Sequence, residues 1–130
     1  MILDTQRLTY HYASGKTLNF PDLQLHAGEK ILIVGPSGSG KSTFLNLLSG
    51  VLPNQHGAIT LNGCDYSTQT RQQLDQLRAD HIGIIFQSLN LIPYLTGFEN
   101  AALSLQFSKE RRAQVADINT SIDQLAEGLG

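Results

Sequence analysis

The fold is decided by one stretch of this sequence, Gly35-Pro36-Ser37-Gly38-Ser39-Gly40-Lys41-Ser42. It matches the phosphate-loop pattern G-x-x-x-x-G-K-[ST] in full. A β-branched apolar run over 30–34 precedes it, and a helix pattern over 41–49 follows it. A strand, a glycine-rich loop and a helix in this order predict a loop that binds phosphate.

Each residue type in this stretch has a chemical reason. Glycines allow positive φ, so that successive backbone N–H groups and the helix N-terminus point at an anion. Lys41 can bridge the terminal phosphates of a triphosphate, and Ser42 offers a hydroxyl to Mg²⁺. The alternative is a strand–helix turn that binds nothing, and the full motif in its context disfavours it. The loop alone indicates an NTPase or a kinase without distinguishing them.

Two apolar runs, 30–34 and 82–86, are predicted to be strands buried on both faces, as in a parallel sheet. The predicted helix over 41–49 would provide a right-handed crossover between parallel strands. The expected fold class is α/β, with a P-loop NTPase core around a mostly parallel sheet.

An antiparallel β subdomain is predicted beside this core. Residues 1–12 indicate a strand and residues 13–16 a turn, and two short strands are expected within 17–27. Another strand over 57–62 ends at the turn pair Asn62-Gly63.

The rest of the chain is predicted to be helical. Residues 70–80 and 97–107 fit two helices, the first of them solvated on one side. From Lys109 onward one apolar stripe predicts an amphipathic helix, in which Arg111-Arg112 is interpreted as a solvated face. The stripe consists of Val115, Ile118, Ile122 and Leu125.

Composition excludes several classes of protein. The chain has 130 residues, a net charge of −2 from 9 basic and 11 acidic residues, and one cysteine. The charge gives no support for a nucleic-acid partner, and a single cysteine excludes an internal disulfide framework. The N-terminus does not fit a signal peptide, and the apolar runs are far shorter than the roughly 20 residues that span a bilayer.

An ordered set of segments resembles the ATP-binding cassette (ABC) ATPases. The stretch from Gly35 to Thr43 resembles their Walker A motif, Ile82 to Gln87 their Q-loop, and Thr96 to Asn100 the T-x-x-E-N sequence that follows it. Gly28-Glu29-Lys30 resembles the turn before the phosphate-loop strand, and the sequence after residue 48 resembles their L-x-G-x-x-x-P stretch. The segment over 78–93 is most similar to the lipoprotein-release and macrolide-exporter branch (LolD/MacB-like), whose members work with FtsX-like permeases.

The resemblance implies a set of site residues. Gln87 would contact Mg²⁺ or the attacking water, so that Lys41 and Gln87 are the catalytic candidates and Ser42 and Gln87 the metal candidates. Tyr12 resembles the aromatic residue that stacks on adenine, with Tyr10 as the rival two residues earlier on the same strand. The nucleotide-binding candidates are Tyr12, Gly35, Pro36, Ser37, Gly38, Ser39, Gly40, Lys41, Ser42 and Thr43.

The family pattern is incomplete over residues 1–130. The LSGGQ signature, the Walker B strand with its Asp-Glu and the switch histidine do not occur, so we expect an incomplete nucleotide-binding domain with a truncated helical subdomain. The carboxylates that order water and Mg²⁺ are therefore missing.

The resemblance implies an ATPase subunit that binds ATP and Mg²⁺, pairs with a second ATPase subunit, and drives an FtsX-like permease. Its place would be cytoplasmic, peripheral on the inner face of the cell membrane. The alternatives are a nucleotide-binding remnant without turnover and a soluble ABC ATPase of repair or translation.

Overall fold

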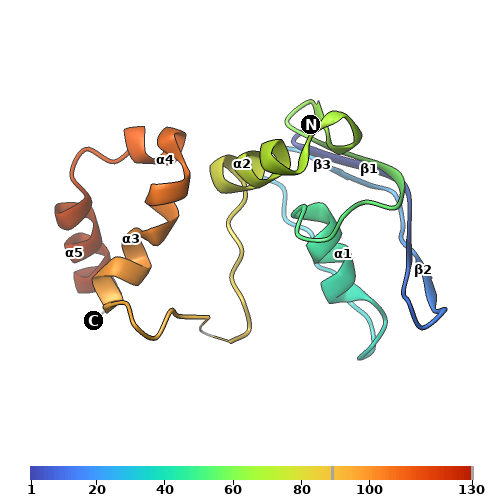
Figure 1. Cartoon of the computed structure of the whole chain (residues 1–130), viewed down its shortest axis with the longest axis horizontal. Coiled ribbons are helices and arrows are strands. Elements are labelled where there is room, and N and C mark those ends of the chain that lie inside the picture. The colour runs from blue at the N-terminus through green and yellow to red at the C-terminus, as the bar shows by residue number, and fades with distance from the viewer. Residues whose placement is uncertain (89, 130) are drawn as a thin grey trace. The chain divides into compact units, whose positions relative to one another are not determined.

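The computed structural model describes residues 1–88 and 90–129 (Figure 1). The chain divides into two units, Met1–Leu74 and Asp75–Gly130. The first unit holds a small β-sheet, the phosphate loop and the helix after it, and the second unit is mainly helical. Leu89, which belongs to the segment similar to the exporter branch, lies outside the described residues.

The sheet of the first unit is centred on one long strand, β1 (Leu3–His11). One edge of β1 pairs with β2 (Thr17–Asn19) and with β3 (Leu23–Leu25), and the other edge pairs with β4 (His56–Leu61). The short strand β5 (Cys64–Asp65) pairs with β4 and completes the order β2-β1-β4-β5. All these pairings are antiparallel, so the predicted antiparallel subdomain is confirmed.

Local turns explain why the antiparallel strands could be predicted. Residues 13–16 join β1 to β2, as the turn signal indicated. Asn62 and Gly63 have positive φ values of 49° and 78° between β4 and β5. Two consecutive positive φ angles are what a tight hairpin turn with the right-handed twist of its strands requires, and Asn-Gly supplies them at low cost.

The core of the first unit forms between the sheet and α1 (Lys41–Leu48), which lies alongside the strands in Figure 1. Leu8 and Ile59 of the sheet are 1% and 0% exposed, and Leu47 of α1 is 1% exposed. Each such side chain contributes about 1.5–3 kcal/mol when it is fully buried. The ring of Phe44 stacks on Phe20 with centroids 4.9 Å apart, which ties α1 to the segment after β2.

The second unit contains the remaining helices. α2 (Arg71–His81) spans the boundary between the two units, and α3 (Gly97–Phe107) follows the segment around Gln87. Both confirm helices that the sequence predicts. α3 begins with a capping box, in which the side chains of Thr96 and Glu99 each accept from the other's backbone N–H.

The predicted helix after residue 109 is divided into two. α4 (Lys109–Ala113) ends early, and α5 (Ile118–Leu129) begins after a short break. The carboxylate of Asp117 accepts from the backbone N–H groups of Asn119 and Thr120, at 3.2 and 3.3 Å. Asp117 therefore starts a new helix, and the prediction of one continuous helix is wrong because this local cap was overlooked.

The two strands predicted for a parallel sheet are not formed. Residues 30–34 and 82–86 have no strand assignment, and Leu32, Val34 and Ile85 are 85%, 80% and 100% exposed. Every strand pairing among the described residues is antiparallel. A parallel strand needs neighbours that supply its backbone hydrogen bonds, and these two runs belong to different units. The prediction of buried strands and a parallel crossover is therefore wrong for this structure.

Gly57 occupies a position that excludes a side chain. It has a φ of 89°, where β4 faces an irregular pairing with β1 between Gln6 and Thr9. A Cβ at residue 57 would lie 2.4 Å from the carbonyl oxygen of Gln6 and 2.5 Å from that of Arg7. Both contacts are with backbone, so the two strands would have to separate.

We expect Gly57→Ala to lower the free energy of unfolding by more than Gly63→Ala does. Gly63 also has a positive φ, 78°, but no atom lies within 4 Å of the position of its Cβ. The control therefore carries only the backbone strain, about 1–2 kcal/mol, whereas Gly57→Ala adds an overpacking cost of about 1–3 kcal/mol. Urea unfolding followed by circular dichroism measures the difference. Equal losses in the two variants would contradict the close packing at Gly57.

Candidate functional site

The phosphate loop makes a tight turn into α1. The backbone N–H of Ser39 donates to the carbonyl oxygen of Pro36 at 3.2 Å, and Gly38 and Gly40 have φ values of 76° and 101°. A Cβ at residue 40 would lie 2.5 Å from Cδ1 of Leu18 on β2. Glycine at position 40 is therefore favoured by the backbone conformation, and any side chain there would also have to displace the end of Leu18.

The N-terminus of α1 is open. Gly40 is its N-cap residue and provides no side-chain hydrogen bond, and the first turn carries no acidic residue. The first N–H groups of a helix have no intrahelical acceptor and carry partial positive charge. The N–H groups at the start of α1 therefore donate to no side-chain cap and are suited to an anion.

The Lys41 ammonium lies over the phosphate loop. Its Nζ donates to the carbonyl oxygens of Gly35 and Pro36 at 2.7 and 2.9 Å. In the described part of the chain no carboxylate lies within ion-pair distance of it. The charge of Lys41 is thus held at the loop without a counter-charge, and one N–H remains for another acceptor.

The two hydroxyl residues that follow Lys41 have different surroundings. Ser42 is exposed, whereas Thr43 is buried and shares a hydrogen bond with the hydroxyl of Tyr12. Among the predicted nucleotide-binding residues, Thr43 therefore already has a protein partner for its side chain. Ser42 is the hydroxyl that faces solvent at the start of α1.

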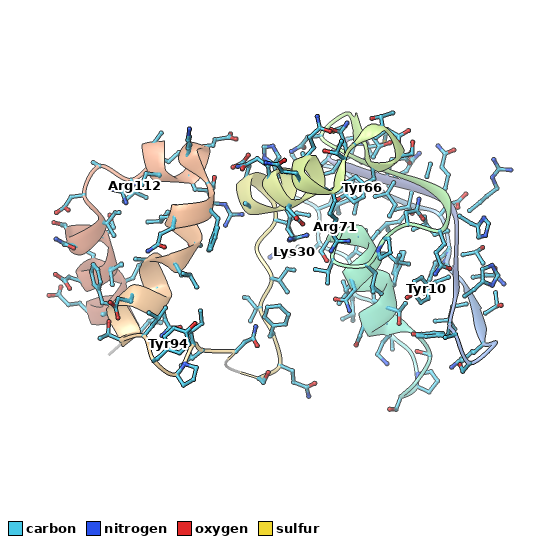
Figure 2. All side chains as sticks on the ribbon, in the orientation of Figure 1. Tyr10, Lys30, Tyr66, Arg71, Tyr94 and Arg112 are labelled. Atoms are coloured by element: carbon cyan, nitrogen blue, oxygen red, sulfur yellow. The ribbon has the colours of Figure 1, made fainter. Side chains whose placement is uncertain are left out.

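Tyr12 lies next to α1, as its bond to Thr43 requires. It directly follows β1, and its ring meets that of Tyr10 edge to face, with centroids 5.1 Å apart and planes at 81°. Tyr10, labelled in Figure 2, is half-buried within β1. The structure thus brings both tyrosines together, and Tyr12 is the one that contacts the helix after the phosphate loop.

Gln87 belongs to the second unit and is exposed there. Residues 35–43 and Tyr12 belong to the first unit, so the structure brings these candidates together without Gln87. The role of Gln87 toward Mg²⁺ or water stays a prediction.

Arg111 is a structural residue that the sequence interpretation missed. Its Nη2 donates to the carbonyl oxygen of Ile82 at 2.8 Å, and its Nε to that of Asp80 at 3.2 Å. It therefore holds the start of the segment that leads to Gln87, and is not only a solvated residue as predicted. Arg112, labelled in Figure 2, is exposed as predicted. No sequence signal separates these neighbouring arginines.

Asp80 lies in the same cluster. The buried hydroxyl of Ser108 donates to its Oδ1 at 2.5 Å, and the side-chain amide of Gln76 donates to both of its oxygens at 3.0 Å. These two donors, Ser108 first, lower the pKa of Asp80 because they stabilise the charged carboxylate. The cluster thus fixes α2 to the start of α4 within the second unit.

A cavity of about 470 Å³ adjoins the phosphate loop within the first unit. Its apolar lining includes Phe20, Phe44 and the largely exposed run over 31–34, and its polar lining includes Ser39 and Lys41. The unpaired run is therefore the wall of a hollow next to the loop.

The loop fits the phosphates of a nucleotide better than it fits a metal by itself. The open N-terminus of α1 and the Lys41 ammonium both favour an anion. No group of three His, Cys, Asp or Glu side chains within residues 1–88 and 90–129 could hold a metal ion. Mg²⁺ would therefore be held mainly through phosphate oxygens, with Ser42 as the nearby hydroxyl.

Such a loop defines the class of phosphate-loop nucleotide-binding proteins. Comparison with protein families matches residues 18–129 to the family described as ABC transporter. The chain belongs to this family, and its fold class is that of the P-loop NTPases. A structure of the ATP-binding cassette MJ0796 bound to ADP and Pi, described as a dimer, superimposes with a TM-score of 0.74 at 34% identity. The match covers 82% of this chain and 47% of that chain.

Curated relatives agree with this assignment. The chain is 38% identical to the ABC transporter ATP-binding protein YtrE of Bacillus subtilis, over 90% of this chain and 56% of the relative. It is 34% identical to the macrolide export ATP-binding/permease protein MacB of Marinobacter nauticus, over 99% of this chain and 20% of the relative. The chain thus spans about half the length of YtrE and a smaller share of MacB. None of the helices in the described residues is long and apolar enough to cross a membrane.

Tyr12→Ala should weaken binding of MgATP, whereas Tyr12→Phe and Tyr12→Trp should retain most of it. Stacking of a base on an aromatic ring contributes about 1–3 kcal/mol and depends on the ring face. The Phe variant loses only the hydrogen bond to Thr43, so it separates this bond from stacking. Isothermal titration with MgATP measures the affinities. A loss in Tyr10→Ala together with none in Tyr12→Ala would assign the stacking to Tyr10 instead.

Proposed function

We propose that this chain is the ATP-binding part of an ABC transporter, in which ATP binding and hydrolysis drive a membrane permease. One observation carries the proposal: Lys41 lies over a glycine-rich loop at the uncapped N-terminus of α1. This arrangement offers backbone donors and a charge to a polyphosphate in one place. Membership of the ABC transporter family supports ATP as the nucleotide.

The proposed roles follow from where each residue lies. The loop over 35–40 and the first N–H groups of α1 bind the phosphates, and Lys41 exchanges its loop carbonyls for the terminal phosphate oxygens. Tyr12 stacks on adenine next to α1. Ser42 is the metal candidate in the first unit and Gln87 that in the second.

The proposed reaction is attack of water on the γ-phosphate. Lys41 neutralises charge that spreads over the phosphoryl oxygens. Electrostatic stabilisation of this kind, together with positioning, makes up most of the catalysis of phosphoryl transfer. Mg²⁺ supplies further charge neutralisation when it is bound. The Gln87 amide has both an acceptor and donors, so it can orient a water molecule.

The proposed partners are a membrane permease and a second ATPase subunit. The relative MacB is described as an ATP-binding/permease protein, and the solved cassette MJ0796 is described as a dimer. We propose an FtsX-like permease because the segment over 78–93 is similar to the exporter branch. The protein would then lie on the cytoplasmic face of the membrane, bound to the permease. Its net charge of −2 favours no nucleic-acid partner.

We propose that residues 1–130 form the N-terminal part of the cassette. The signature, Walker B and switch-histidine motifs do not occur in this sequence. The catalytic carboxylate would then have to come from polypeptide beyond these residues. The alternative, a nucleotide-binding remnant without turnover, shares the binding site and differs only in hydrolysis.

Lys41→Ala should weaken MgATP binding by about 10- to 100-fold. The variant removes a charge-assisted contact to phosphate, which contributes about 1.5–3 kcal/mol. Lys30→Ala is the matched control, because Lys30 is an exposed lysine of the same unit without a hydrogen bond to the described loop residues (Figure 2). Isothermal titration measures both. Unchanged affinity in Lys41→Ala would refute the phosphate-loop assignment.

The 130-residue chain by itself should release no phosphate from MgATP above the uncatalysed background. It has the phosphate loop but no apolar strand followed by Asp-Glu, so no carboxylate in the motif position can order the water. The measurement is phosphate release by the purified chain, with Lys41→Ala as the blank. Turnover that disappears in Lys41→Ala would show that the chain contains its own catalytic group.

A further inference from the structure

A second lysine, Lys16 in the turn between β1 and β2, also contacts the phosphate loop. The Nζ of Lys16 donates to the carbonyl oxygen of Gly38 at 2.9 Å. Gly38 is the central glycine of the loop, and its φ of 76° requires glycine or a strained residue. Lys16 lies outside the phosphate-loop motif, so no pattern in the sequence indicated this contact.

Backbone hydrogen bonds of the hairpin fix the position of the Lys16 backbone. The N–H of Tyr12 donates to the carbonyl oxygen of Lys16 at 2.8 Å, and the N–H of Gly15 donates to that of Tyr12 at 2.9 Å. Lys16 therefore lies directly across the turn from Tyr12. The same turn contacts the nucleotide site twice, through the Tyr12 hydroxyl at Thr43 and through the Lys16 ammonium at Gly38.

The charge of Lys16 is not neutralised by the protein. No carboxylate lies within ion-pair distance of its ammonium in the described residues, and Gly38 is its one hydrogen-bond acceptor there. Two acidic residues of the first unit have other partners: Asp22 accepts from the N–H of Arg7, and Glu29 accepts from that of His26. An ammonium has three N–H donors, so two donors of Lys16 remain available.

We infer that Lys16 is a second cation for the phosphate tail of the nucleotide, acting beside Lys41; this rests on the proposed function. The two ammonium groups contact different carbonyl oxygens of one loop, Lys41 those of Gly35 and Pro36 and Lys16 that of Gly38. Residues 33–44 contain no acidic residue that would offset them. A ligand with more phosphate charge gains more from both cations, whereas an uncharged nucleoside gains nothing.

A purely structural role for Lys16 leads to a different result. If its ammonium only tethers the hairpin to the loop, its loss displaces Tyr12 and weakens every ligand that carries adenine by the same factor. If it neutralises phosphate, its loss weakens MgATP more than MgADP and leaves adenosine unaffected. The dependence on phosphate number therefore separates the two roles.

The experiment titrates Lys16→Met, Lys16→Arg and the control Lys30→Met with MgATP, MgADP and adenosine by calorimetry. For Lys16→Met we expect about fivefold weaker binding of MgATP, a smaller loss for MgADP and none for adenosine. A change of about fivefold in affinity is the size expected for a solvent-exposed charge contact. Lys16→Arg keeps the charge and should bind MgATP within about twofold of wild type. Lys30→Met removes the same charge from another exposed site and should leave all three affinities unchanged. Lys16 is exposed, so the variants should fold, which circular dichroism checks.

A measurement without nucleotide tests the contact itself. Loss of a cation from the carbonyl of Gly38 weakens the polarisation of the Gly38–Ser39 peptide group. The ¹⁵N–¹H resonance of Ser39 should therefore shift in Lys16→Met and stay in place in Lys30→Met. An unshifted Ser39 resonance would overturn the contact from which the inference starts.

The outcomes separate this inference from the proposed function. If wild type binds MgATP and Lys41→Ala loses it while Lys16→Met binds normally, the inference about Lys16 is wrong and the proposed function stands. Equal losses of MgATP and adenosine in Lys16→Met also overturn the inference in favour of a tether. If wild type binds no MgATP, the proposed function fails and the inference fails with it.

Discussion

The left-handed backbone at Gly40 is the constraint on which the candidate site depends. Its φ is 101°, and a Cβ there would also meet the end of the Leu18 side chain, which would have to move. Glycine adopts this φ at low cost, so the phosphate loop can turn directly into α1 beside β2. Glycine also leaves the helix without a side-chain cap, because the N-cap residue has no side chain to offer. The backbone conformation at residue 40 and the open helix end therefore occur together.

The hairpin between β1 and β2 connects this packing to the candidate ligand contacts. Tyr12 and Lys16 face each other across one turn and contact α1 and the loop respectively. The sequence places Tyr12 in the site only by its resemblance to a family position, and gives no indication of Lys16. A hairpin that carries both groups would hold an aromatic ring and a charge at a fixed separation, which lowers the entropy lost when a nucleotide binds.

The accuracy of the sequence predictions follows the range of the interactions involved. The antiparallel strands, the Asn62-Gly63 turn and the helix after Lys41 depend on neighbouring residues, and the structure confirms them. The runs over 30–34 and 82–86 have the composition of buried strands, but a strand forms only when distant segments pair with it. Arg111 was missed for a similar reason, since its acceptor at Ile82 lies 29 residues away. The turn of the phosphate loop could be predicted because its residues form one contiguous motif, and the roles of these residues toward a nucleotide stay predictions.

The loop keeps its turn although the run before it is largely exposed and forms no strand. Its described contacts come from the antiparallel side: Leu18 of β2 lies against Gly40, Phe20 stacks on Phe44, and Lys16 bonds to Gly38. Lys41 adds bonds within the loop itself. The turn therefore does not depend on a parallel sheet to hold it. A parallel sheet would instead remove the exposed side chains of Ile31, Leu32 and Val34 from water, at about 25 cal/mol for each Å² of apolar surface. In this chain the phosphate loop therefore takes its conformation without burial of the apolar run before it, and the contacts that accompany its turn come from the β1–β2 hairpin and α1.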